Sequence, residues 1–173
     1  MTPVATERDA LLAAIYDAPA DDAPREVYAD WLMEREHPRG ELIMLEMKKR
    51  RSAEESERLT ALQAIPGLFG PLASLTDSDS ARERGLYRAI KLRYNANTLS
   101  WRAGATSPLA ALIEEIDLET HLPTPEDFAT FAAAAPRLRK VGMSREAIAL
   151  VDPDHAKHWK VVGTGQSQHV VRL

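Results

Sequence analysis

Cysteine is absent from this chain of 173 residues, and aromatic residues make up only 6% of it. Without cysteine the chain has no disulfide, no thiolate zinc site and no thiol nucleophile. Neither sign of charge dominates, since 22 Lys and Arg face 26 Asp and Glu, for a net charge of -4. General binding to a phosphate backbone needs clustered positive charge, so this balance argues against nucleic acid as a partner.

Long apolar runs are also missing. The first residues, Met1 to Asp9, have neither the basic region nor the apolar stretch of a secretion signal, and no later segment has the length of a membrane span. We therefore expect a cytoplasmic protein with no membrane partner. The 45% hydrophobic and 28% charged fractions are those of an ordinary globular protein that needs no metal or disulfide to fold.

The first third of the chain has the pattern of short helices separated by breaks. Thr6 is suited to cap a first helix, and Asp22 followed by Pro24 is suited to begin a second. His37-Pro38-Arg39-Gly40 predicts a break with glycine in a turn, and Ser52-Ala53-Glu54-Glu55 matches a capping box. The side of the second helix that we expect to be buried carries Val27, Tyr28, Trp31 and Leu32. These signals predict four short helices.

A weak repeat follows the helices. The composition shifts to Gly, Pro, Ser and Asp over residues 67–84, which predicts a linker. Beyond it, a pattern of apolar-x-x-apolar-x-apolar occurs three times, with central residues Ile90, Ile116 and Val141. The steps of 26 and 25 residues lie within the period of leucine-rich repeats, roughly 20 to 29 residues. Whether residues 158–173 complete a fourth, poorer copy stays open.

The segments between the copies predict helices. Ser107-Pro108 and Thr124-Pro125 each combine a capping side chain with a proline in the first turn. Strand and helix then alternate, which predicts parallel strands.

Parallel stacking would place outward charges of opposite sign side by side. The predicted pairs are Lys91 with Asp117, Arg93 with Glu119, and Glu115 with Lys140. Stacked repeats expose an extended strand face, and such faces bind other macromolecules. We therefore expect these six residues to bind a protein partner.

Two strings carry a family resemblance, Tyr28-Ala29-Asp30-Trp31-Leu32 and Pro38-Arg39-Gly40-Glu41. Residues 7–47, which contain them, resemble the N-terminal repeat-companion domain of bacterial proteins, whose members often carry leucine-rich-like repeats after this module. The sequence departs from that family at Glu34-Arg35-Glu36-His37, where a Glu-Arg-Gly turn is usual. The resemblance implies a repeat-bearing scaffold with no known enzyme activity and no catalytic residues.

Asp30 and Arg39 belong to these strings and have two readings. They could form a binding pair, or they could tie the second helix to the turn that follows it. We favour the structural tie, with Trp31 in the core, because an ion pair between neighbouring elements is the commoner use of such residues.

One group of residues has the spacing of metal ligands. His155 and His158 lie three residues apart, with Asp154 next to the first. A third strong ligand is missing, and Asp152-Pro153-Asp154 also has the pattern of a turn and cap, which we favour. We expect no metal, no cofactor and no catalytic residue.

The sequence as a whole predicts an α/β protein. A helical cap over residues 1–66 is joined by the linker to a small leucine-rich-repeat-like solenoid with a parallel sheet over residues 85–173. Its predicted function is that of a non-catalytic protein-interaction or scaffold module. The alternatives are a cytoplasmic inhibitor or immunity-type protein and a metal-dependent enzyme on His155 and His158. The partner's identity and the oligomeric state stay open.

Overall fold

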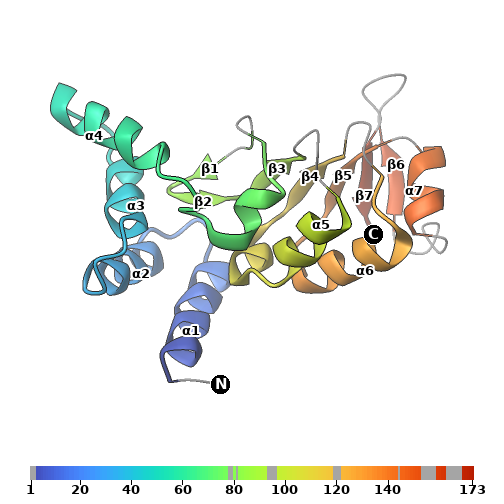
Figure 1. Cartoon of the computed structure of the whole chain (residues 1–173), viewed down its shortest axis with the longest axis horizontal. Helices are drawn as coiled ribbons and strands as arrows, with labels where there is room; N and C mark the ends of the chain where they lie inside the picture. The colour runs from blue at the N-terminus through green and yellow to red at the C-terminus, as the bar shows by residue number, and fades with distance from the viewer. Residues whose placement is uncertain are drawn as a thin grey trace. The chain divides into compact units, whose positions relative to one another are not determined.

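The helix-rich first third and the strand-bearing remainder form two units in the computed structural model of the chain (Figure 1). The helical unit contains residues 1–69 and 82–86, and the sheet unit contains residues 70–81 and 87–173. The structure describes residues 3–77, 80, 82–92, 97–118, 122–143, 145–152, 159–162 and 169–173. Within these residues there are seven α-helices and an open, mixed sheet of five strands, so the fold class is mixed α/β.

The helical unit contains the four helices that the sequence predicts. They are α1 (Pro3–Asp17), α2 (Ala23–Met33), α3 (Arg39–Met47) and α4 (Ala53–Gln63). Thr6 does not cap α1 as predicted, because the helix already begins at Pro3. The capping box at the start of α4 is confirmed, because Ser52 accepts a hydrogen bond from the Glu55 amide and the Glu55 carboxylate accepts one from the Ser52 amide. Asp22 does precede α2, but its side chain makes no capping hydrogen bond and pairs with Arg84.

The core of the helical unit is built mainly from aliphatic side chains, together with Tyr28 and Phe69. Its buried apolar residues include Leu12, Ile15, Tyr28, Leu32, Leu42, Ile43 and Leu62. Val27 was predicted to share the buried side of α2, and this prediction is wrong because its side chain is 55% exposed. Tyr28 and Leu32 face the neighbouring helices, so the buried stripe of α2 is narrower than the apolar pattern suggests.

The predicted break between α2 and α3 is present, but the glycine is not in it. Gly40 lies in the first turn of α3, where a Cβ atom would stand 2.6 Å from the Ala29 carbonyl oxygen and 2.9 Å from the Met33 amide nitrogen. Glycine therefore allows α3 to approach the backbone of α2. The reversal itself is made at Glu36, which has a positive φ of 55°.

A short hairpin follows in the region predicted as a linker. Strands β1 (Arg82–Glu83) and β2 (Leu86–Tyr87) pair around Arg84 and Gly85, whose φ angles are 51° and 79°. Two successive residues with positive φ are the signature of a type I′ turn. In the helical unit, Glu46 of α3 accepts a hydrogen bond from the Gly85 amide at 2.6 Å.

The sheet unit alternates short strands with helical segments. Its elements are η1 (Gly70–Ser74), β3 (Ala89–Lys91), α5 (Thr98–Ala105), η2 (Pro108–Leu112), β4 (Glu115–Asp117), α6 (Pro125–Ala134), β5 (Lys140–Gly142), α7 (Arg145–Val151), β6 (Trp159–Val162) and β7 (His169–Arg172). The strand order in the sheet is β3-β4-β5-β7-β6.

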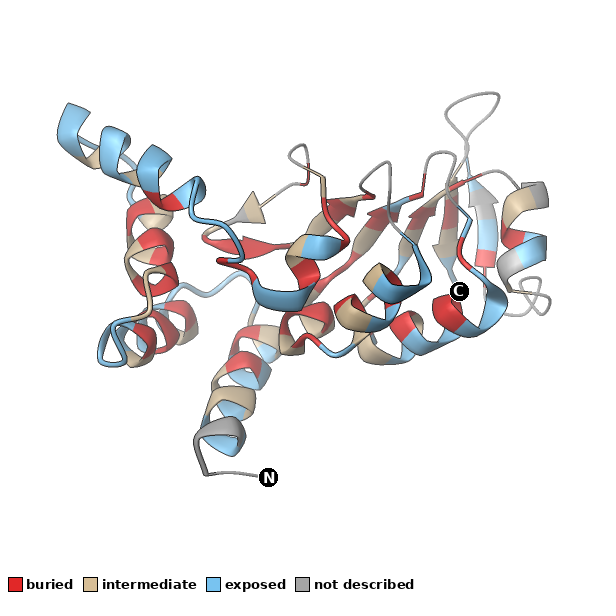
Figure 2. Ribbon diagram, in the orientation of Figure 1, coloured by how far each residue is buried: buried red, intermediate tan, exposed pale blue. Residues whose placement is uncertain are grey.

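The predicted register of the first three strands is confirmed. Ile90 is the Cα partner of Ile116, and Ile116 is the partner of Val141, in parallel pairs. All three side chains are buried, at 2% exposure or less. The central residues of the repeat therefore form one buried row across three strands (Figure 2).

The predicted parallel sheet is found for β3, β4 and β5, but the last two strands do not continue it. β7 pairs antiparallel with both β5 and β6, so β7 lies inside the sheet and β6 lies at its edge. Residues 163–168 are too few to connect a parallel pair, which needs a crossover of a dozen residues or more. A fourth copy within residues 158–173 therefore does not lie beside β5 in parallel, because β7 separates β6 from β5. Residues 158 and 163–168 lie outside the described residues.

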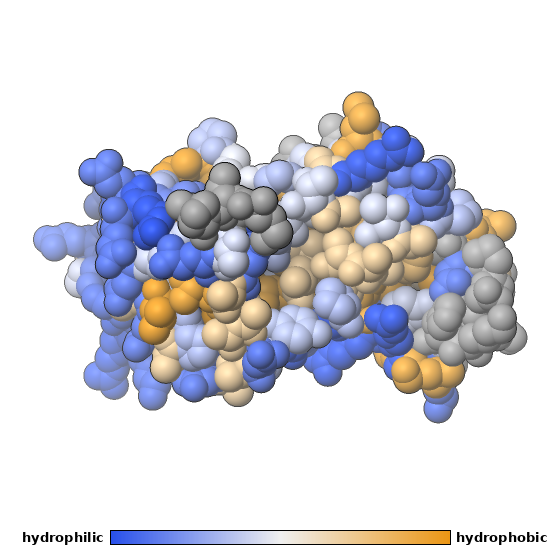
Figure 3. All heavy atoms as spheres, turned by 90° about the horizontal axis from the view of Figure 1, so that it is seen from below, coloured by the Kyte–Doolittle hydropathy of each residue, from blue (hydrophilic) through white to orange (hydrophobic). Residues whose placement is uncertain are grey.

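Aromatic side chains pack between the sheet and its helices. Trp101 of α5 meets Phe131 of α6 edge-on at 5.3 Å between ring centroids, and Phe128 lies 6.3 Å from Trp159 of β6. α5 was not predicted, although Asn97 caps it by accepting from the Ser100 amide. Figure 3 shows a pale to light-orange surface in the region of α5 and α6, where α6 exposes small alanine side chains.

None of the helices in the described part of the chain has both the length and the apolar character needed to cross a membrane.

Candidate functional site

The outward strand residues lie on the face of the sheet that the helices do not cover, which we call the open face. Helices α5 and α6 lie along the other side (Figure 1), and burial alternates along each short strand. The open-face residues of the first three strands are Ala89, Lys91, Glu115, Asp117, Lys140 and Gly142, all of them half-buried or exposed. Of the six predicted partner-binding residues, Lys91, Glu115, Asp117 and Lys140 are therefore on this face. Arg93 and Glu119 lie outside the described residues.

Opposite charges meet laterally on this face, as the repeat predicts. Lys91 is the Cα partner of Asp117, and Glu115 is the partner of Lys140. Lys140 Nζ lies 3.1 Å from Glu115 Oε2. Such cross-strand pairs favour the observed register over a slipped one.

Gly142 leaves room for Asp117 on the open face. A Cβ atom at Gly142 would stand 2.8 Å from Asp117 Oδ1 and 3.3 Å from Asp117 Cα. The missing side chain on β5 thus lets the exposed carboxylate of β4 lie against the neighbouring backbone.

The last two strands extend the open face beyond the predicted residues. Val171 of β7 is the Cα partner of both Lys140 and Lys160, and Lys160 is exposed. Val162 of β6 is 39% exposed. Sequence reasoning missed these residues because the order of the last strands was not predicted.

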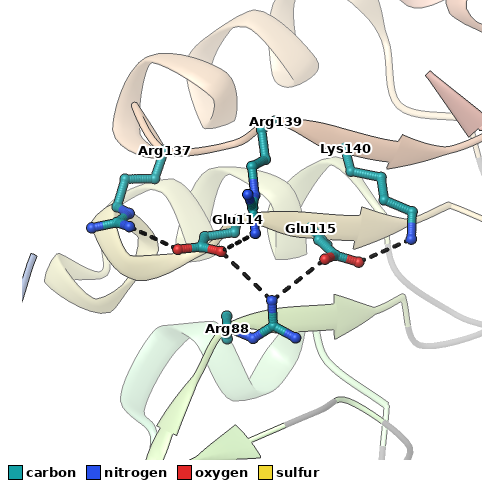
Figure 4. A network of polar contacts seen from close by, with 6 residues as sticks. All are labelled: Arg88, Glu114, Glu115, Arg137, Arg139 and Lys140. Carbon is teal, nitrogen blue, oxygen red and sulfur yellow. Dashed lines mark hydrogen bonds and ion pairs between the residues drawn. The ribbon is translucent and has the colours of Figure 1, made fainter. Parts of the chain in front are cut away.

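A charged network occupies the edge where β3, β4 and β5 begin (Figure 4). Glu114 is buried, with 8% exposure, and accepts hydrogen bonds from Arg137 and Arg139 at 2.8 Å each. Arg88 Nη1 lies 3.6 Å from Glu114 Oε2 and 3.5 Å from Glu115 Oε1. One guanidinium therefore links the buried carboxylate to the carboxylate on the open face.

The backbone holds this network in register. The Glu114 amide donates to the Arg88 carbonyl at 2.8 Å, the Arg139 amide donates to the Glu114 carbonyl at 2.9 Å, and the Arg172 amide donates to the Arg139 carbonyl at 2.8 Å. The sequence did contain a signal for these residues, since Arg88, Glu114 and Arg139 are spaced like the central residues of the repeat, two positions ahead of them.

The electrostatics of this edge favour the ionised form of Glu115. Partial burial would raise the pKa of its carboxyl, but the hydrogen bond from Lys140 and the nearby charges of Arg88 and Arg139 outweigh burial and hold the pKa below its ordinary value. Glu115 therefore carries its negative charge at neutral pH.

The residues of the family-like strings lie in the helical unit and are arranged differently from the prediction. Asp30 is exposed, whereas the buried Arg39 donates a hydrogen bond to the Tyr28 hydroxyl, and its guanidinium lies 5.6 Å from the Tyr28 ring centroid. Trp31 is half-buried rather than in the core, stacking on Tyr28 at 6.0 Å and carrying Arg35 4.1 Å above its ring. Arg39 ties α3 to α2 through a phenol, not through Asp30.

Within the described part of the chain, no group of three or more His, Asp or Glu side chains is placed to hold a metal ion. The candidate ligands His155, His158 and Asp154 lie outside that part.

Comparison with protein-family models, with curated proteins and with solved structures finds no match for this chain. The resemblance to the repeat-companion domain therefore stays a prediction.

Proposed function

We propose that this protein is a non-catalytic interaction module that binds a protein partner through the open face of its sheet. The observation that carries the proposal is the parallel register of β3, β4 and β5, which gathers Lys91, Glu115, Asp117 and Lys140 on the side of the sheet away from α5 and α6. A flat face with charges of both signs is suited to partner selection, because complementary charges favour the right partner and like charges repel wrong ones.

The proposal includes a leucine-rich-repeat-like winding of the sheet unit. The central residues Ile90, Ile116 and Val141 occupy equivalent positions, and α6 separates β4 from β5 as the repeat requires. Repeats of this kind bury a continuous core and leave their strand face for binding. The resemblance of residues 7–47 to the repeat-companion domain, carried by their sequence strings, supports the same assignment.

The face carries charges that already satisfy one another, which supports a binding role over a catalytic one. Glu115 is engaged by Lys140 and Arg88. Enzymes that use carboxylates as acids or bases at neutral pH raise the pKa of one of them, whereas the pKa of Glu115 is lowered. An inhibitor or immunity-type protein would act through the same face by occlusion.

Charge reversal on the face tests the proposal. The variant that combines Lys91→Glu with Asp117→Lys exchanges the two signs and leaves net charge unchanged. We expect it to lose the partner that the wild-type protein captures from its native host, as measured by cross-linking and co-purification.

A matched control exists in the helical unit, where Arg58 and Glu41 form an exposed pair at 2.6 Å. Exchanging these two residues makes the same kind of change away from the open face and is expected to leave capture intact. Capture that survives the exchange of Lys91 and Asp117 would show that the face is not the binding surface.

A further inference from the structure

The end of the sheet at which β3, β4 and β5 begin is cationic, although the chain as a whole is acidic. We name this edge the basic rim and define it by Arg88, Arg137, Arg139, Lys140, Lys160 and Arg172. Two described carboxylates lie within the rim, Glu114 and Glu115, and both are held by rim residues. Asp152, which follows α7, accepts a hydrogen bond from Trp159 Nε1 at 2.9 Å. Among the described residues, basic side chains thus outnumber acidic ones at this edge.

The internal ion pairs leave part of the rim's donor capacity facing solvent. A guanidinium has five N–H donors and an ammonium has three. Arg139 contacts Glu114 through Nη2, yet its side chain is 62% exposed. Lys140 is 40% exposed while paired with Glu115, and Lys160 is exposed on the edge strand. The rim can therefore bind further anionic groups without losing its own pairs.

The rim continues onto the open face as a row across three strands. Lys140, Val171 and Lys160 are successive Cα partners on β5, β7 and β6. Because neighbouring strands lie about 4.8 Å apart, the two lysines are roughly 10 Å apart with an apolar side chain between them. An extended segment crossing these strands would bring carboxylates within reach of both lysines.

The observations favour carboxylates over nucleic acid as the ligand. The rim already binds a carboxylate in place, since Glu114 receives Arg137 and Arg139 at 2.8 Å each. Single-stranded nucleic acid is bound on aromatic stacking platforms, and the described open-face residues include no Phe, Tyr or Trp.

A second basic cluster, Lys48 to Arg51, has two of its four residues engaged within the helical unit. Lys48 pairs with Glu55 at 2.5 Å, and Arg51 donates to the carbonyls of Leu45 and Lys48 at 2.9 and 3.1 Å. These contacts connect α3 to the start of α4. The run from Lys48 to Arg51 thus has a structural use, and it serves as an internal comparison for the rim.

We propose that the basic rim binds an acidic, extended segment of the partner protein, with Arg139, Lys140 and Lys160 receiving its carboxylates. This inference rests on the proposed function and names the chemistry of the partner. The interaction is predominantly ionic, so it weakens as salt is added.

The test uses a fluorescein-labelled oligoglutamate of about eight residues, long enough to cross the sheet at roughly 3.3 Å per residue. We expect its anisotropy to rise on titration with the full chain at low salt and to fall as salt is added. Lys160→Glu should weaken binding about fivefold, and its combination with Arg139→Gln should weaken it about tenfold or more. Lys160→Glu alone keeps the test valid if the change at Arg139 perturbs folding, because Lys160 is an exposed residue of the edge strand.

Arg50→Glu is the matched control, because it makes the same charge reversal in the run from Lys48 to Arg51 and should leave binding unchanged. Equal weakening by Arg50→Glu and Lys160→Glu would overturn the proposal in favour of general charge attraction. Tighter binding of an oligothymidine of about eight nucleotides than of oligoglutamate would overturn it in favour of nucleic acid. The remaining outcome is that capture of the partner is lost in the variant Lys91→Glu with Asp117→Lys and yet is unchanged in Lys160→Glu. In that case the proposed function stands, and the rim is not the site that binds an acidic segment.

Discussion

His37 shows how one side chain between two helices responds to pH. Its Nδ1 accepts a hydrogen bond from the Arg39 amide at 3.2 Å, so the ring must be unprotonated at that nitrogen. Burial, and then the charge of Arg39, lower the pKa of His37 below its ordinary value of 6.5. The unfolded chain therefore takes up a proton at a higher pH than the folded chain does.

We expect the stability contributed by His37 to be present above about pH 6.5 and to be lost as pH falls through the lower folded pKa. The His37 Cε1 proton resonance should titrate below pH 6.5 in the folded protein, while the exposed reference peptide Glu-His-Pro titrates at the ordinary value. His37→Asn, which keeps a side-chain acceptor without the titration, should flatten this part of the stability profile. A His37 pKa above 6.5 would contradict the prediction.

Glu36 occupies a backbone conformation that glycine adopts at no steric cost. Its φ of 55° lies in the left-handed region, which costs an L-residue about 1 to 2 kcal/mol. Glycine removes this cost but adds unfolded-state entropy, which offsets part of the gain. We therefore expect Glu36→Gly to raise the free energy of unfolding by roughly 0.5 to 1 kcal/mol. Urea denaturation measures the change.

The control for this prediction is two residues away. Glu34 has a φ of -58°, in the right-handed region, so Glu34→Gly should lower the free energy of unfolding of the protein. If Glu36→Gly and Glu34→Gly had the same effect, backbone strain at Glu36 would not be its cause.

At the scale of elements, the contact between α2 and α3 depends on one missing side chain. A methyl group at Gly40 would stand within 2.9 Å of backbone atoms of Ala29 and Met33, and backbone cannot move aside as a flexible side chain can. We expect Gly40→Ala to destabilise the helical unit by about 2 to 3 kcal/mol, despite the better helix propensity of alanine.

Far-ultraviolet circular dichroism during thermal unfolding would measure this effect. Ala10→Gly, at an exposed position of α1, is the converse control and should cost only about 1 kcal/mol. A neutral or stabilising Gly40→Ala would mean that helix propensity, not the close approach, decides stability at this position.

The elements that the sequence predicts best are those with local signals. Ser52 and Glu55 form the capping box that their spacing indicates, and Thr124 caps α6 by accepting from the Asp127 amide. The register of Ile90, Ile116 and Val141 was also predictable, because apolar centres and opposite charges select the same alignment. Agreement between two independent patterns is what makes a register specific.

Non-local arrangement accounts for what the sequence did not predict. β7 lies between β5 and β6 in the sheet, and no short sequence pattern indicates which of the last two strands pairs with β5. Glu114 and Arg139 keep the spacing of the repeat, but the burial of the Glu114 carboxylate that receives Arg139 was not predicted. Arg39 was assigned to Asp30 by charge, whereas burial selected the Tyr28 hydroxyl.

At the scale of the whole molecule, both units contain carboxyl groups whose pKa lies below the ordinary value. In the helical unit the pKa of Glu41 is lowered by the hydrogen bond from Arg58. In the sheet unit Asp127 is 2% exposed. Burial would raise its pKa, but hydrogen bonds from Thr124, Arg102 and Thr98 outweigh burial and lower it. Such groups stabilise the folded chain above their unfolded pKa and cease to do so as pH falls through the folded pKa.

Acid unfolding of the wild-type chain should therefore have two origins at different pH. The loss near and below pH 6 comes from His37, and a second loss below about pH 4 comes from the carboxyl groups. Asp127→Asn should reduce the second loss, because its amide does not titrate, while destabilising the chain at neutral pH by about 1 to 3 kcal/mol through its weakened contacts with Arg102 and Thr124. His37→Asn should reduce only the first loss. Urea midpoints measured for the three proteins from pH 3 to pH 8 would separate these contributions, and a wild-type midpoint that stayed constant down to pH 3 would contradict both assignments.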